Sequence, residues 1–222
     1  MRTWIVSLLA VALVAITAAT ATPAHAKVRT KLVEYKDGDA TLEGYLAWDD
    51  AAKGKRPGVL VVHAWMGLDA NARARAEQLA KLGYVAFAAD IYGKGVRPKD
   101  RDEAAKQAGT YKADRALLRR RVNAGLTALL AQPKVDATRT AAIGYCFGGT
   151  TVLELARSGA AVSGVVSFHG GLDSPTPADG KHIRAKVLVL HGAADGFVAP
   201  ADKAAFEQEL TTAKVDWQLV AY

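Results

Sequence analysis

Residues 140–149 read Thr-Ala-Ala-Ile-Gly-Tyr-Cys-Phe-Gly-Gly. The first six form a short, mainly apolar run, typical of a strand that is buried on both faces of a parallel sheet. Helical periodicity starts near Gly149, so Cys146 falls in a tight turn between strand and helix. This stretch therefore predicts a parallel sheet that is covered by helices.

The rest of the chain repeats the pattern. Further strands are predicted at 58–63, 84–90, 162–168, 186–191 and 216–222, and helices at 70–82, 113–131, 149–157 and 201–213. Two segments of alternating apolar and polar residues, 29–35 and 41–48, are joined by the turn residues 36–39. They predict an antiparallel hairpin that precedes the parallel strands. The fold class is therefore α/β, with a mostly parallel, doubly wound sheet, an N-terminal hairpin and helices on both faces.

The segment Gly144-x-Cys146-x-Gly148-Gly149 has the spacing of a nucleophile elbow with cysteine as the nucleophile. Small residues on either side of the cysteine let a strained strand-to-helix turn fold tightly. The amino end of the helix favours the thiolate form of the sulfur, and the backbone N–H of Phe147 would face a developing oxyanion.

A buried structural cysteine before a glycine-rich helix start is the alternative interpretation, since such a start also suits phosphate or dinucleotide binding. Neither Gly-x-x-x-x-Gly-Lys-Ser/Thr nor Gly-x-Gly-x-x-Gly occurs at 144–149. We therefore favour a catalytic Cys146. Asp195 follows the predicted strand 186–191, where the acid of a catalytic triad is expected after the nucleophile, although an Asp in such a loop is often only a helix cap.

Four segments, at 61–67, 89–93, 144–149 and 191–195, resemble the dienelactone hydrolase family in their order and spacing. The resemblance covers residues 28–222 and implies an α/β-hydrolase fold. It also implies a Cys-Asp-His hydrolase of esters or lactones that forms a thioester acyl-enzyme with Cys146 and needs no metal or organic cofactor. By the same resemblance, the backbone of Trp65 would be a second oxyanion donor and Lys94 would receive a substrate carboxylate.

Two features depart from the family pattern. Ala64 stands where members with the dienelactone activity have a glutamate that helps to control the ionisation of the thiol. The triad histidine is expected shortly after the strand that ends at Tyr222, so the domain, 27–222, is expected to be truncated there. His63 and His169 could lie at the active edge, but packing or substrate contact is the favoured interpretation of both.

The first 26 residues indicate a secretory signal peptide. Arg2 precedes an apolar run from Trp4 to Ile16, and residues 23–26 offer an Ala-x-Ala cleavage site after Ala26. The run is shorter than the roughly 20 residues of a spanning helix. We therefore expect a periplasmic or secreted protein that is not attached to the membrane after cleavage.

The chain carries a net charge of +7, and much of the excess lies between Lys94 and Arg121, with ten Lys or Arg against four Asp or Glu. One interpretation is that this basic segment binds nucleic acid or an anionic surface. The helical spacing of its apolar residues instead favours a solvated helix face on which Arg119, Arg120 and Arg121 point outward. We expect no nucleic-acid partner, a small ester or lactone as the substrate and, by default, a monomer. A non-catalytic exported binding protein with the same fold is the alternative to an enzyme.

Overall fold

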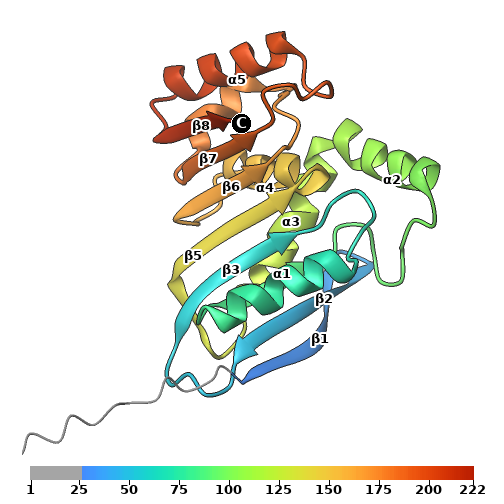
Figure 1. Cartoon of the computed structure of the whole chain (residues 1–222), viewed down its shortest axis with the longest axis vertical. Coiled ribbons are helices and arrows are strands. Elements are labelled where there is room, and N and C mark those ends of the chain that lie inside the picture. The colour runs from blue at the N-terminus through green and yellow to red at the C-terminus, as the bar shows by residue number, and fades with distance from the viewer. Residues whose placement is uncertain (1–26) are drawn as a thin grey trace, which may run out of the picture.

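The computed structural model describes residues 27–222. The predicted signal peptide and its cleavage site lie outside this part of the chain. The described residues form one eight-stranded sheet with the strand order β1-β2-β4-β3-β5-β6-β7-β8 (Figure 1). Among them, no helix is long and apolar enough to cross a membrane.

The predicted hairpin is confirmed and is longer than expected. Strand β1 spans Val28–Asp37 and pairs antiparallel with β2, Ala40–Asp49. The two-residue connection contains Gly38 at φ 57°, a left-handed conformation that glycine adopts without strain. Strand β2 also runs antiparallel to β4, so the hairpin extends one edge of the parallel sheet.

The six remaining strands are parallel to one another. They are β3 (Arg56–Val62), β4 (Val85–Ala89), β5 (Val135–Tyr145), β6 (Gly164–Phe168), β7 (Lys186–His191) and β8 (Trp217–Ala221). Every residue of β4 is buried, as a continuous apolar run in a two-sided sheet predicts. The carboxyl ends of these strands therefore open onto one edge of the sheet.

Helices cover both faces of the sheet, as expected. Helix α1 (Ala70–Lys81) packs alanines at 72, 76 and 80 onto β2, β3 and β4, because small residues at helical spacing let the helix approach the sheet closely. Helices α3 (Arg115–Leu130), α4 (Phe147–Arg157) and α5 (Pro200–Thr212) contribute to the other, larger core. Figure 1 shows α1 in front of the sheet and α3 behind it.

Two elements were not predicted. Helix α2 spans Arg101–Ala113, and a 3-10 helix, η1, spans Pro177–His182. In α2 only Ala104, Ala108 and Tyr111 are buried, so its sequence carries too few apolar residues to mark a periodic stripe. Helix α4 also begins at Phe147 rather than Gly149, directly after the cysteine.

The expectation of a solvated basic face on α3 was wrong for two of its three arginines. The Arg119 side chain is 21% exposed and pairs with Glu154, while Arg121 is 13% exposed and pairs with Asp37. Arg120, 60% exposed, does face solvent. Because neighbouring elements cover α3 on more than one side, arginines outside its apolar stripe become internal ion-pair partners.

Candidate active site

Four parallel strands bring the predicted site residues to one edge of the sheet. Trp65 lies just after β3, Cys146 after β5, His169 after β6 and Asp195 after β7. Because β3, β5, β6 and β7 are consecutive neighbours in the sheet, these residues lie side by side although the sequence separates them by up to 130 positions. The carboxyl ends of parallel strands are where sites form in this type of sheet.

The glycines of the elbow are required because backbone meets backbone there. A Cβ at Gly144 would lie 2.0 Å from the carbonyl oxygen of Gly148, and one at Gly148 would lie 2.3 Å from that of Val62. A Cβ at Gly149 would lie 2.9 Å from the backbone nitrogen of Gly170. Glycine at these three positions therefore lets the first turn of α4 press against the ends of β3 and β6.

Cys146 itself has a strained backbone, with φ 55° and ψ −115°. A residue with a Cβ rarely has a positive φ, and such strain of about 1–3 kcal/mol is concentrated at functional sites. The backbone N–H of Cys146 donates to Phe168 at 2.9 Å, which ties the elbow to the end of β6. This conformation places the side chain at the start of α4, as a nucleophile elbow requires.

Cys146 lines a cavity of about 430 Å³. The walls come from the loop after β3, from α2, from the start of α4 and from the loops after β6 and β7; they comprise Ala64, Trp65, Ala108, Lys112, Phe147, Thr150, His169, Gly171, Phe197 and Val198. Most of these side chains are apolar, which suits a small organic substrate. Phe197 is 99% exposed and stands at the rim.

Both expected oxyanion donors are on this cavity. Phe147 is the first residue of α4, so its N–H has no partner within the helix. Within residues 27–222, no acceptor is bonded to the N–H of either Phe147 or Trp65. The Trp65 loop is held in place, since its carbonyl accepts from the Tyr92 hydroxyl at 3.0 Å. Two backbone donors beside a nucleophile can stabilise an oxyanion.

Asp195 lies behind His169. The His169 Nδ1 is 4.0 Å from the Asp195 Oδ2, while Asp195 Oδ1 accepts from the Phe197 N–H at 2.9 Å. His169 lines the cavity with Cys146 and has a φ of 44°. His169 thus lies on the cavity wall, with its side chain 55% exposed, which is compatible with the substrate-contact interpretation.

His63 is a packing residue, as favoured. Its ring is buried, its Nδ1 lies 2.6 Å from the Ala64 carbonyl oxygen, and its Nε2 lies 3.2 Å from the backbone nitrogen of Ile91. One tautomer satisfies both contacts, with Nδ1 donating and Nε2 accepting. Burial lowers the pKa of His63, which keeps the imidazole neutral. Both ring nitrogens are thus used, and the contact of Nε2 with Ile91 links the end of β3 to the end of β4.

Lys94 is placed away from the cavity, contrary to its expected role. It forms an ion pair with Glu34, and the Glu34 side chain raises the pKa of the lysine. Lys112, from the unpredicted helix α2, is the cation that lines the cavity. Because α2 itself was not expected, the sequence offered no reason to place Lys112 there.

An aromatic cluster beneath the elbow was also missed. The Tyr92 ring lies 4.9 Å from that of His63, 5.3 Å from that of Phe147 and 5.3 Å from that of Tyr111. The cluster braces both the Trp65 loop and the start of α4. The signal available was the Asp90-Ile91-Tyr92 segment at the end of a buried strand, which marks the active edge but does not identify the packing partner.

No metal centre is evident in the part of the chain that the structure describes. Within residues 27–222, no three His, Cys, Asp or Glu side chains are grouped so that they could hold a metal ion. The polar groups at the cavity are instead a thiol, a hydroxyl, an imidazole and an ammonium, with the Asp195 carboxylate behind them.

Comparison with known proteins identifies the family of this chain. The family model described as "Dienelactone hydrolase family" matches residues 42–222. A curated relative from a Synechocystis species, named "Putative carboxymethylenebutenolidase", is 28% identical over 210 residues, which cover 88% of this chain and 84% of the relative.

Solved structures are similar over the same span. The structure called m3DLH is 45% identical with a TM-score of 0.85, and covers 88% of this chain and 81% of its own. A dienelactone hydrolase-like promiscuous phosphotriesterase from metagenomic libraries is 42% identical with a TM-score of 0.83, at the same two coverages. The sheet and its helices are those of the α/β-hydrolase fold, and the chain belongs to the dienelactone hydrolase family.

Proposed function

We propose that this protein hydrolyses a small ester or lactone by covalent catalysis at Cys146. The observation that supports this most directly is the strained Cys146 backbone at the start of α4, on a cavity also lined by Phe147 and Trp65, whose backbone N–H groups have no bonded acceptor within residues 27–222. Membership of a hydrolase family fits the same chemistry.

In the proposed reaction, the Cys146 thiolate attacks the carbonyl carbon and forms a C–S bond. The N–H groups of Phe147 and Trp65 stabilise the oxyanion, and the C–O bond then breaks as an imidazolium protonates the leaving oxygen. Water attacks the resulting thioester, the imidazole takes a proton from that water, and the C–S bond breaks. Asp195 is proposed to hold the imidazole in the correct tautomer and to stabilise its charged form.

We propose that this imidazole belongs to a histidine beyond Tyr222. The backbone of Tyr222 is bonded to the Asp195 loop, because its carbonyl accepts from Ala193 at 2.9 Å and its N–H donates to His191 at 3.1 Å. A residue that follows Tyr222 therefore starts beside that loop. We also propose that the enzyme acts outside the cytoplasm, because residues 1–26 have the sequence of a cleaved signal peptide.

The test uses the mature protein expressed from its complete reading frame. Hydrolysis of short aryl esters and of five-membered lactones is followed for the wild type and for Cys146→Ala and Cys146→Ser. We expect a rate well above that of Cys146→Ala, together with an acyl adduct on Cys146 in mass spectra of quenched reactions. A wild-type rate equal to that of Cys146→Ala on every substrate would refute the proposal and favour a binding protein.

A second candidate activity is phosphotriester hydrolysis at the same cysteine. Likeness at 42% identity to a promiscuous phosphotriesterase favours it. An aryl dialkyl phosphate added to the substrate panel tests it, and release of the aryl alcohol that depends on Cys146 would support it. No release above the Cys146→Ala background would remove it.

A further inference from the structure

A cluster of seven charged side chains lies beneath the cavity, where α3, α4, α5 and η1 meet. We call it the ion cluster; its members are Arg115, Arg119, Glu154, Arg157, Asp173, Asp179 and Glu209. Glu154 is fully buried at its centre and accepts from Arg119 at 2.7 Å and from Arg157 at 2.9 Å. Arg157 also binds both carboxylate oxygens of Glu209.

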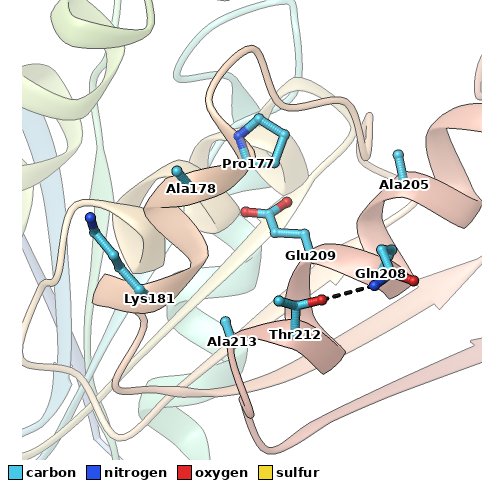
Figure 2. A pocket seen from close by; sticks show the side chains of 8 residues that line it. All are labelled: Pro177, Ala178, Lys181, Ala205, Gln208, Glu209, Thr212 and Ala213. Atoms are coloured by element: carbon cyan, nitrogen blue, oxygen red, sulfur yellow. Dashed lines mark hydrogen bonds between the residues drawn. The ribbon is translucent and has the colours of Figure 1, made fainter.

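One end of the ion cluster borders a second cavity, of about 460 Å³, between η1 and α5 (Figure 2). Figure 2 shows the Glu209 side chain directed between the two helices. The side chains that line this cavity include no cysteine, histidine or serine. Because Glu209 is already bound by Arg157, this end of the cluster serves to join α4 to α5.

The other end of the ion cluster reaches the active-site cavity. Arg115 Nη2 lies 2.5 Å from the Asp173 Oδ2, and Arg115 Nη1 lies 3.9 Å from the Glu154 Oε1. Asp173 ends a five-residue segment, 169–173, which contains two residues of the cavity wall, His169 and Gly171. An ion pair of the cluster is therefore attached to a loop of the site.

The inner end of this segment is fixed by close packing on α4. A Cβ at Gly170 would lie 2.6 Å from the Thr150 backbone nitrogen, and the Gly171 carbonyl accepts from the Thr150 hydroxyl at 3.3 Å. Leu172 is buried in the core. At the inner end His169 also lies 4.0 Å from the Asp195 carboxylate. The outer end, at the 43%-exposed Asp173, is held by the ion pair with Arg115, so loss of that pair would free this end of the segment first.

An ion pair with a partly exposed member adds little net stability, because water screens the attraction, and the Asp173 side chain is 43% exposed. What such a pair does supply is geometry, since a guanidinium holds a carboxylate in a fixed direction. We propose that Arg115 and Asp173 are positioning residues, whose ion pair holds segment 169–173 as a wall of the Cys146 cavity. This inference rests on the proposed function where it is tested by enzyme kinetics, but not where it is tested by alkylation of Cys146.

The chain offers a matched control one helical turn away. Arg119 binds Asp179 at 2.6 Å, much as Arg115 binds Asp173, and both arginines are on α3. Asp179 is on η1, however, and does not line the active-site cavity. Asp173→Asn and Asp179→Asn remove the same kind of ion pair from the same cluster, but only the first acts on segment 169–173, whose His169 and Gly171 line the cavity.

The first readout is steady-state hydrolysis with the mature protein from its complete reading frame. We expect Asp173→Asn to raise KM roughly five- to tenfold, with kcat changed less than about twofold, because a loosened wall weakens substrate binding before chemistry. Asp179→Asn should leave KM within about twofold of the wild type. Equal KM values for the two variants, or a wild-type KM for Asp173→Asn, would overturn the proposal.

The second readout does not need turnover. The chain has one cysteine, so alkylation by a bulky maleimide reports access to Cys146 alone. Asp173→Asn should be alkylated roughly threefold faster or more than the wild type, with Asp179→Asn unchanged. If no ester is hydrolysed but this difference is found, the proposed function fails and the positioning role stands. If hydrolysis occurs but the alkylation rates are equal, the positioning role fails.

Discussion

Gly148 should tolerate no side chain, because it is where α4 presses against the end of β3. A Cβ there would lie 2.3 Å from the carbonyl oxygen of Val62 and 2.6 Å from that of His63, against an ordinary contact of 3.4–4 Å. In Gly148→Ala the start of α4 must therefore retreat by about 1 Å, a strain that costs roughly 1–3 kcal/mol in a packed core. For a domain of this size, we expect the melting temperature to fall by about 2–12 °C.

The same retreat should damage catalysis more than stability. It carries the Phe147 N–H away from the oxyanion, and loss of one such donor lowers kcat by about 100- to 1,000-fold. The assays are thermal unfolding by circular dichroism and hydrolysis of an aryl ester. The alkylation rate of Cys146 checks that the variant is still folded.

Gly109→Ala is the control for this substitution. Gly109 lies within α2, and a Cβ there would meet no atom within 4 Å. Alanine is favoured over glycine in a helix by about 0.5–1 kcal/mol, so the melting temperature should rise by about 2 °C with no change in activity. If Gly148→Ala and Gly109→Ala behave alike, the argument from backbone contact at the elbow is wrong.

Three further outcomes are expected. His169→Asn should keep hydrolysis within about tenfold of the wild type, because the proposed proton carrier lies beyond Tyr222; a loss equal to that of Cys146→Ala would instead assign His169 as the base. Glu154→Gln leaves Arg119 and Arg157 without their buried carboxylate and should lower the unfolding free energy by about 3–5 kcal/mol in urea titrations. Because burial lowers the pKa of His63 below the ordinary histidine value of about 6.5, the unfolded chain binds an extra proton in acid. Stability should therefore fall below pH 6.5, by at most about 1.4 kcal/mol per pH unit, and His63→Gln should flatten that slope if measured by urea unfolding at pH 7 and pH 5.

Much of the fold follows from local sequence patterns. Continuous apolar runs predicted the buried strands within a few residues, because a strand covered on both faces has no polar side to interrupt it. Gly38 and its neighbours predicted the hairpin through their turn chemistry. Helix α2 was not predicted, because most of it faces solvent and its sequence therefore has no regular stripe of apolar residues.

The candidate site divides in the same way. Cys146, Phe147 and their glycines could be predicted together because the elbow is a contiguous segment with its own steric requirements. Lys112, Tyr92 and Gly171 could not, because each comes from a different element and their proximity depends on how the elements pack. Lys94 had the position along the chain that the family resemblance requires, but in the fold it pairs with Glu34 and does not line the cavity.

The sequence by itself determined the strand-turn-helix at Cys146, the parallel sheet and the class of hydrolase that the chain resembles, since each is written in short stretches whose backbone geometry admits few residue types. Tertiary structure alone decided which charges became internal. Arg119 was expected on a solvated helix face, and only the packing of α3 against α4 removes it from water and joins it to the buried Glu154. Burial is a property of the assembled elements, and it is burial that turns such side chains from solvated charges into internal ion-pair partners.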